Sequence, residues 1–161
     1  MVDQRELVLQ RILAVLNTVE GVAEGNNEKS VFRNRGQVPE DKRPAIVLLD
    51  GIERKRTVTV GGGRSRMPAV EMDLSPQIFV LLKTRSNLTN VNVGEELSEF
   101  RVRVLAALFA DMELWDLLGG DSGQIEYRGA DTDMQTGSNM TGEMQLDIAF
   151  TYIFDPDDLT A

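Results

Sequence analysis

The N-terminal segment has the hydrophobic periodicity of an amphipathic helix. It runs from about Asp3 to Glu20, opens with an Asp-x-x-Glu capping pattern at Asp3 and Glu6, and is followed by Gly21. At about 100° per residue, its apolar side chains fall within an arc of roughly 160°, the width of one core-facing stripe. We therefore expect a helix with one buried face. The stripe consists of Val8, Leu9, Ile12, Leu13, Val15, Leu16 and Val19.

A second helix is predicted from about Glu95 to Ala110, with Glu95 and Glu96 in the first turn, where the helix dipole favours negative charge. Its apolar residues cover an arc of about 220°, wider than one contact face needs, so we expect this helix to contact two bodies. Arg101 lies in the middle of the arc, so it either pairs with a carboxylate or lies where the core opens. A short helical turn follows from Asp111 to Leu118. The apolar residues of the arc are Leu97, Phe100, Val102, Val104, Leu105, Ala107, Leu108 and Phe109.

Apolar runs and alternating segments predict a β-sheet. Ala45–Leu49 is apolar throughout, which suits a strand covered on both faces. Two runs on either side of the glycine-rich turn Gly61–Arg66 indicate a hairpin with a basic tip. Glu143–Phe154 alternates most regularly and has one wholly apolar face. The predicted strands are Ala45–Leu49, Arg54–Val60, Ala69–Asp73, Gln77–Thr84 with Pro76 at its start, Gln124–Arg128 and Glu143–Phe154, with room for a short one at Val31–Phe32.

Two long polar segments are predicted to be loops. They are Gly25–Arg43 and Gly129–Gly142, and the second, which carries Asp131 and Asp133, is too long and polar for a tight hairpin turn. The order of elements is a helix, several strands, a helix and two strands, which indicates an α+β fold. We expect one domain over residues 1–161, built on a single mixed or antiparallel sheet with both helices on one face and with long hairpin and loop extensions.

Composition narrows the possible chemistry. Hydrophobic residues make up 42% and charged residues 27%, as in ordinary globular domains. The chain has no histidine and no cysteine, so the usual zinc, copper and haem ligand sets, disulfides and histidine- or cysteine-based catalysis are excluded. The remaining possibilities for catalysis or metal binding are carboxylate pairs, Ser-Lys chemistry, and Mg²⁺ or Ca²⁺ held by oxygen ligands. We expect no cofactor and no enzymatic activity.

The chain shows no membrane or secretion pattern. Its longest apolar run, Ile78–Leu82, is much too short to span a bilayer, and the N-terminus lacks a signal-peptide pattern. We therefore expect a soluble protein made in the cytoplasm.

Charge is divided unevenly along the chain. The net charge is −9, with +3 through Arg85 and −12 from Ser86 onward. Two faces of opposite sign would allow subunits to stack head to tail, and an acidic second half disfavours nucleic-acid binding across the whole surface. The alternative is solvated charge that only keeps the protein soluble.

Three local motifs have simpler interpretations than a ligand site. Gly61–Arg66 lacks the P-loop spacing and precedes a predicted strand, so a hairpin tip or an assembly contact is favoured over a phosphate site. Asp131 and Asp133 begin like a calcium loop, but the glycine and glutamate of an EF-hand do not follow. A basic set could contact phosphates, but no stacking aromatics lie among its members, so a solvated or subunit-facing patch is favoured. This set is Arg54, Lys55, Arg56, Arg64 and Arg66.

Several stretches together resemble the tail terminator, or tail completion, proteins of long-tailed bacteriophages. The resemblance covers most of the chain and lies in fold and packing signatures, without a catalytic motif. The stretches are Val19–Val22, Arg33–Asn34, Arg43–Gly51, Met67–Val80, Glu96–Arg101, Asp111–Leu114, Ile125–Gly129 and Tyr152–Pro156.

The resemblance implies a structural virion protein. Its subunits would form a hexameric ring on the head-proximal end of the tail tube, end tail polymerisation, and present a surface to the neck, while DNA passes through the channel without specific binding. The expected partners are further copies of the chain, the tail tube protein and a neck or head-completion protein, with assembly in the host cytoplasm. A head-completion or stopper protein is the closest alternative, and a nucleic-acid-binding module using the basic hairpin is the alternative from another class.

Within this hypothesis, two groups of residues are candidates for contacts. The candidate assembly interface consists of Arg54, Lys55, Arg56, Arg64, Arg66, Arg101 and Phe109. The candidate channel or contact loop carries Asp131 and Asp133.

Overall fold

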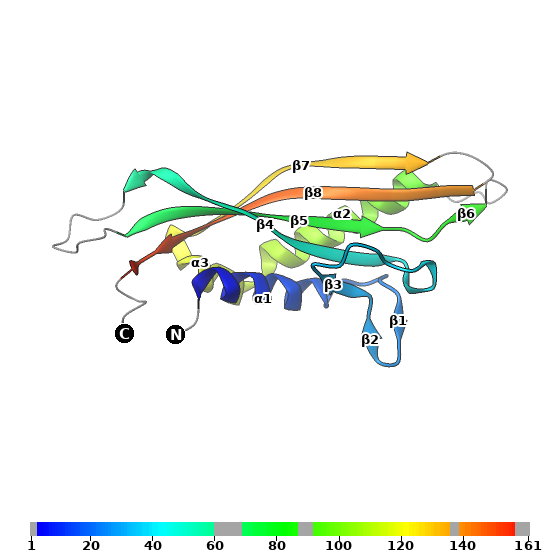
Figure 1. Ribbon diagram of the computed structural model, residues 1–161, viewed down its shortest axis with the longest axis horizontal. Helices are drawn as coiled ribbons and strands as arrows, with labels where there is room; N and C mark the ends of the chain where they lie inside the picture. Colours follow the sequence, from blue (N-terminus) through cyan, green and yellow to red (C-terminus); the bar gives the residue numbers. More distant parts are fainter. Residues whose placement is uncertain (1–2, 60–68, 87–91, 136–138, 157–161) are drawn as a thin grey trace.

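The computed structural model describes residues 3–59, 69–86, 92–135 and 139–156 and has an α+β fold with a mixed sheet (Figure 1). The helices α1, α2 and α3 lie on one face of the sheet, as predicted. The helices are α1 (Gln4–Leu16), α2 (Val93–Ala110) and α3 (Met112–Leu118), with 3₁₀ turns at η1 (Glu40–Lys42) and η2 (Gly120–Ser122). The strands are β1 (Glu24–Gly25), β2 (Glu28–Lys29), β3 (Val31–Arg33), β4 (Ala45–Thr59), β5 (Val70–Leu81), β6 (Arg85–Ser86), β7 (Gln124–Gln135) and β8 (Asn139–Phe154).

The main sheet runs in the order β3-β4-β5-β8, with β7 paired to the other edge of β8 and short β6 paired to the start of β8. Strand β3 is parallel to β4, whereas β4, β5, β8 and β7 pair antiparallel, so the sheet is mixed. The short strand predicted at Val31–Phe32 is therefore confirmed as part of β3. Strands β1 and β2 form a separate hairpin whose turn uses Asn26 and Asn27 at positive φ.

The core lies between the sheet and the helices. Strand β8 supplies one row of it, since Met144, Leu146, Ile148, Phe150 and Tyr152 are all buried, which confirms the predicted apolar face. A smaller cluster lies on the opposite face of the sheet, where Val38 covers Ala45 and Val47. The strand predicted at Ala45–Leu49 is therefore covered on both faces, as its apolar run indicated.

Two expected strand boundaries are wrong. The runs on either side of Asp50-Gly51 form one continuous strand, β4, and those on either side of Pro76 form one strand, β5. The ladder pairs Leu49 with Gln77 and then Ile52 with Ser75, so the extra residues Asp50 and Gly51 bulge opposite Pro76. Proline has no N–H to donate, and a bulge at this point removes the need for one.

The loop predicted over Gly129–Gly142 is also wrong. Strand β7 continues to Gln135 and β8 begins at Asn139, so Asp131 and Asp133 lie on a strand. They pair in register with Gln145 and Glu143 of β8. Around these two residues β7 is an edge strand with exposed side chains on both faces, so the backbone ladder alone maintains it and a polar sequence is tolerated.

The helix ends differ from their predicted positions. α1 stops at Leu16 rather than Glu20, although Val19 in the following turns is still buried. Asp3 caps the helix by accepting a hydrogen bond from the backbone N–H of Arg5, but Glu6 does not complete a capping box, because its carboxylate binds Arg33. α2 begins earlier than predicted, because Asn92 caps it by accepting from the N–H of Glu95.

Candidate assembly surfaces

The outward side of α2 carries a row of exposed apolar side chains. Val102 is 60% exposed and Phe109 is 40% exposed, whereas Leu97, Val104 and Leu108 on the same helix are fully buried. Most of the wide apolar arc predicted for this helix is therefore buried or half-buried, and Val102 and Phe109 are its exposed part.

Helical geometry places the exposed part opposite the sheet. At about 100° per residue, Val102, Ala106 and Phe109 lie roughly 140–200° around the axis from the centre of the buried face. Met112, 69% exposed, follows at the start of α3, after the break in the helix at Asp111. We call the exposed residues Val102, Ala106, Phe109 and Met112 the helix surface.

Carboxylates border the helix surface. Glu95 and Glu99 precede it on α2, and Glu113 follows it on α3; all three are exposed. Glu99 is paired with Arg103 at 3.2 Å, and Glu113 is paired with Arg11 of α1. The apolar row therefore has a rim that is mostly acidic.

Arg101 lies beside this row and is half-buried. No carboxylate of the described residues lies within ion-pair distance of its guanidinium. Of the two alternatives for Arg101, the structure therefore favours an opening at the edge of the core rather than a buried pair.

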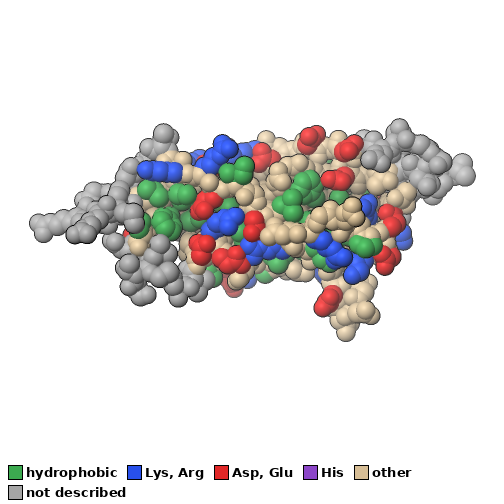
Figure 2. All heavy atoms as spheres, viewed as in Figure 1, with side chains coloured by type: hydrophobic (Ala, Val, Ile, Leu, Met, Phe, Trp, Pro, Cys, Tyr) green, Lys and Arg blue, Asp and Glu red, His purple; other side chains and the backbone are tan. Residues whose placement is uncertain are grey.

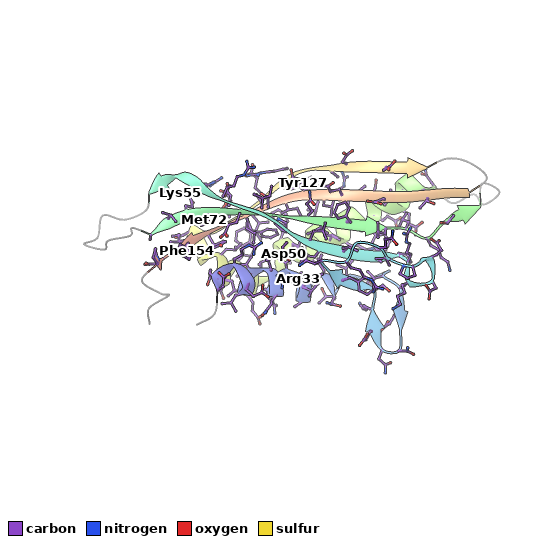
Figure 3. All side chains as sticks on the ribbon, in the orientation of Figure 1. Arg33, Asp50, Lys55, Met72, Tyr127 and Phe154 are labelled. Atoms are coloured by element: carbon purple, nitrogen blue, oxygen red, sulfur yellow. The ribbon has the colours of Figure 1, made fainter. Side chains whose placement is uncertain are left out.

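The basic set is divided by the sheet. Arg54 is opposite Asp73 in the register of β4 and β5, so Arg54 and Arg56 face away from the helices and Lys55 alternates to the other side. Lys55 lies near the outer end of β4 (Figure 3). Arg64 and Arg66 fall outside the described residues.

A groove of about 610 Å³ lies on this helix-free face of the sheet. Ile52, which is 56% exposed, lies in this groove among the cationic side chains. We call this hollow the arginine groove; its lining residues are Ile52, Arg54, Lys55, Arg56, Asp73, Ser75, Arg128 and Asp147.

Asp73 organises the floor of the arginine groove. Its Oδ2 accepts a hydrogen bond from Arg56 Nε at 3.0 Å and lies 3.7 Å from Arg128 Nη2. Its Oδ1 accepts from the buried hydroxyl of Thr151 at 2.7 Å. Arg56 and Arg128 are thus held in place, whereas Arg54 is exposed and has no ion pair with any described residue.

Asp131 and Asp133 lie at another part of the same sheet face. They and Glu143 line a shallow hollow of about 350 Å³ beside Phe79. Figure 2 shows blue side chains over the outer end of β4 and red ones over β7, while blue and red side chains are intermixed over the rest of this view.

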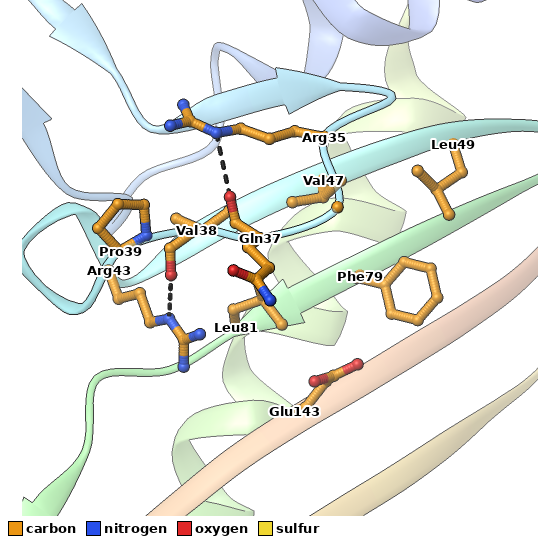
Figure 4. Close-up of a pocket in the computed structure, with 11 residues that line it drawn as sticks. Arg35, Gln37, Val38, Pro39, Arg43, Val47, Leu49, Phe79, Leu81 and Glu143 are labelled. Atoms are coloured by element: carbon orange, nitrogen blue, oxygen red, sulfur yellow. Dashed lines mark hydrogen bonds between the residues drawn. The ribbon is translucent and has the colours of Figure 1, made fainter.

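A further hollow, of about 740 Å³, has an apolar floor made by Val47, Leu49, Phe79 and Leu81 (Figure 4). The segment before η1 forms its wall. There Arg35 Nε donates to the carbonyl of Gln37 at 3.1 Å, and Arg43 Nε donates to the carbonyl of Val38 at 3.1 Å. Both guanidinium groups are thus engaged in shaping the wall.

Sequence reasoning missed a three-element ionic clamp. Arg33 of β3 donates Nη1 to Glu6 of α1 at 2.6 Å and Nε to Asp50 of β4 at 2.7 Å (Figure 3). Hydrogen bonds from Arg33 hold the pKa values of both carboxyl groups below their usual range, and the two carboxylates raise the pKa of the guanidinium. The partners are 27 and 17 residues from Arg33, so no local spacing reveals them.

A second missed contact joins α1 to the start of α3. Arg11 donates Nη2 to Asp111 Oδ2 at 2.6 Å, and Asp111 Oδ1 also caps α3 by accepting from the N–H of Leu114 at 2.8 Å. The hydrogen bond from Arg11 lowers the pKa of Asp111. The capping role was readable from the sequence; the long-range partner was not.

Comparison with models of known protein families and with curated protein sequences finds no match to this chain. Among the described residues, no group of three or more acidic side chains is arranged to hold a metal ion. None of the described helices is both long enough and apolar enough to cross a membrane.

Proposed function

We propose that the protein is a structural subunit that assembles into a ring, as a tail terminator of a long-tailed bacteriophage does, rather than an enzyme. The observation that carries this proposal is the helix surface. Val102 and Phe109 are exposed two turns apart on the well-packed helix α2, Met112 is exposed at the start of α3, and exposed apolar side chains gathered in this way are an interaction surface more often than a solvated one. A subunit that covers this row with a neighbouring copy removes it from water.

The charges fit an assembly. A ring subunit contacts two neighbours through different surfaces, and opposite signs on those surfaces direct the encounter. This chain carries an acidic rim around the helix surface and clustered arginines in the arginine groove.

The rest of the proposal follows the resemblance described above. The ring, which we propose to be hexameric, would cap the head-proximal end of the tail tube, end its polymerisation and bind a neck protein, within a virion assembled in the host cytoplasm. Asp131 and Asp133, exposed on β7, would face passing DNA and repel it, so that it slides without specific binding.

Two alternatives make different predictions. A head-completion or stopper protein would also form a ring but would bind the portal side of the neck and leave tubes uncapped. A nucleic-acid-binding module would use the arginine groove, but Arg56 and Arg128 are already engaged by Asp73, and no aromatic side chain lines the groove. It would bind DNA with a steep dependence on salt.

Electron microscopy of tail tubes tests the proposal. Purified tube protein polymerised with this chain present should give tubes of limited length with a ring at one end. Tubes that grow to the same length with and without the chain, and that bear no ring, would contradict the proposal. Salt-sensitive DNA binding by the isolated chain would favour the nucleic-acid alternative.

A further inference from the structure

We propose that the helix surface of one copy docks into the arginine groove of the next copy, so that the subunits join head to tail. This inference rests on the proposed assembly function and specifies which two surfaces meet. Among the described residues, Ile52, Val102, Phe109 and Met112 are the exposed large hydrophobic side chains, and they occur only on these two surfaces.

The two surfaces are complementary in charge. The helix surface is bordered by Glu95, Glu99 and Glu113 and by two arginines of the same helix, Arg101 and Arg103. The arginine groove carries three arginine side chains, those of Arg54, Arg56 and Arg128, and two carboxylates, Asp73 and Asp147. Opposite net charge guides the encounter of two copies and opposes the contact of like surfaces.

The surfaces are also complementary in shape. Ala106 lies about one helical turn from each of Val102 and Phe109, so its small side chain leaves a gap in the row into which an aliphatic side chain such as Ile52 can pack. The apolar residue at the centre of the contact is then surrounded by charged groups, the arrangement of an interface with an apolar centre and a polar rim.

The positions of the two surfaces determine the type of assembly. The helix surface points away from the sheet, and the arginine groove lies on the helix-free side of the sheet. A contact between different surfaces on opposite sides is heterologous, so each copy retains one free surface of each kind and can add another neighbour until a ring closes. Pairing of two helix surfaces would instead end at a dimer and would bring the acidic rims together.

Mixing two disabled variants tests this arrangement. Val102→Lys/Phe109→Lys removes the helix surface and leaves the groove intact, whereas Ile52→Ser/Arg54→Ser removes the apolar centre and the free cation of the groove and leaves the helix surface intact. All four side chains are exposed, so circular dichroism and melting temperature should match those of the wild type. Glu28→Gln, on the exposed β1–β2 hairpin, is the matched control.

Analytical ultracentrifugation should show that each variant alone is monomeric where the wild type and the control assemble. The equimolar mixture should form a 1:1 dimer, because one intact helix surface and one intact groove remain. The dissociation constant of this pair should rise at least tenfold between low and high salt, because the contact is partly ionic.

Three outcomes would overturn the inference. If the wild type assembles but the mixture stays monomeric, the pairing of these two surfaces is wrong and the assembly function stands. If either folded variant still assembles alone, its altered surface is not part of the contact. If the wild type remains monomeric at every concentration and on tail tubes, the assembly function fails together with the inference.

Discussion

Single residues hold the layers of this protein together through ionic contacts that the sequence does not reveal. Arg33 joins β3 to α1 and β4, and Arg11 joins α1 to the residue that caps α3. Both arginines bind carboxylates with two nitrogens, a geometry that lysine cannot reproduce. These contacts fix how α1 lies against the sheet edge.

Arg33→Met should lower the free energy of unfolding by about 2 kcal/mol, because hydrogen bonds to charged, partly buried carboxylates are lost. Lys83→Met, at an exposed position, should change it by less than about 0.5 kcal/mol. Urea denaturation of both variants measures the difference. Equal stability of the two would show that the clamp contributes nothing.

The ion pairs of Arg33 and Arg11 also predict that the stability of the fold depends on pH. The pKa values of Glu6, Asp50 and Asp111 are lowered in the folded state by their arginine partners. Their contribution to stability is therefore complete above the ordinary values of 4.5 for Glu6 and 3.8 for Asp50 and Asp111, and it is lost as the pH falls below them through the folded pKa values. Melting temperatures measured from pH 6 to pH 2.5 should fall steeply for the wild type and less steeply for Arg33→Met. Parallel curves would contradict this origin of the acid sensitivity.

Arg101 should matter little for stability, since it is half-buried and pairs with no carboxylate of the described residues. Arg101→Ala should change the free energy of unfolding by less than about 1 kcal/mol. Chemical denaturation checks this, with Arg33→Ala as the comparison. A loss as large as that of Arg33→Ala would mean that Arg101 is part of an ionic contact.

At the scale of elements, two long strands cross the sheet because a bulge and a proline face each other. Gly51 has a φ of 69° and a Cβ added there would lie 2.0 Å from the carbonyl oxygen of Ser75. Only glycine fits this backbone conformation and this close approach. The arginine groove depends on it, because Ile52 and Arg54 follow the bulge directly, and a one-residue shift would turn them to the helix side.

Gly51→Ala should therefore destabilise the fold by about 2 kcal/mol or more, through the left-handed conformation and the clash with β5. Gly36→Ala is the matched control, because a Cβ there meets no atom within 4 Å. Thermal unfolding of both variants distinguishes them. A Gly51→Ala variant as stable as the control would show that the bulge can be rebuilt without cost.

The sequence predicted the elements well where one face is apolar. The periodicity of β8 and the buried stripe of α1 are confirmed because both elements lie against the core. The sequence does not reveal β7 around Asp131, where backbone pairing alone maintains the strand. It also indicates strand ends at Asp50-Gly51 and at Pro76, although these residues face each other within continuous strands. Glycine and proline indicate a local interruption of a strand. Whether the strand ends there depends on how it pairs with the neighbouring strand, which the sequence does not show.

Some of the candidate site residues were predictable from the sequence, and others were not. The excess apolar arc of α2 predicted apolar residues beyond one core-facing stripe, and the structure exposes Phe109 and Val102 of that arc. Of the predicted basic patch, Arg54 and Arg56 point to the helix-free face, and Lys55 borders the groove although its side chain alternates to the other face. Ile52 and Arg128 were not selected, because they come near these arginines only through the sheet.

At the scale of the whole molecule, the fold presents two different surfaces on opposite sides. The helix surface has an acidic rim, and the arginine groove carries clustered cations around Ile52. A subunit of this kind can continue to add copies in one direction, and closure of the series into a ring gives every surface a partner. The proposed role as a tail terminator depends on that closure, because an open series would form a filament.

Native mass spectrometry across a range of concentrations, with and without tail tubes, is the decisive test of the proposed ring. The wild type should shift from monomer to hexamer as its concentration rises or when tubes are present, while Val102→Lys/Phe109→Lys should stay monomeric with an unchanged melting temperature. A wild type that remains monomeric at all concentrations and on tail tubes, or a variant that forms the hexamer equally well, would contradict the proposal.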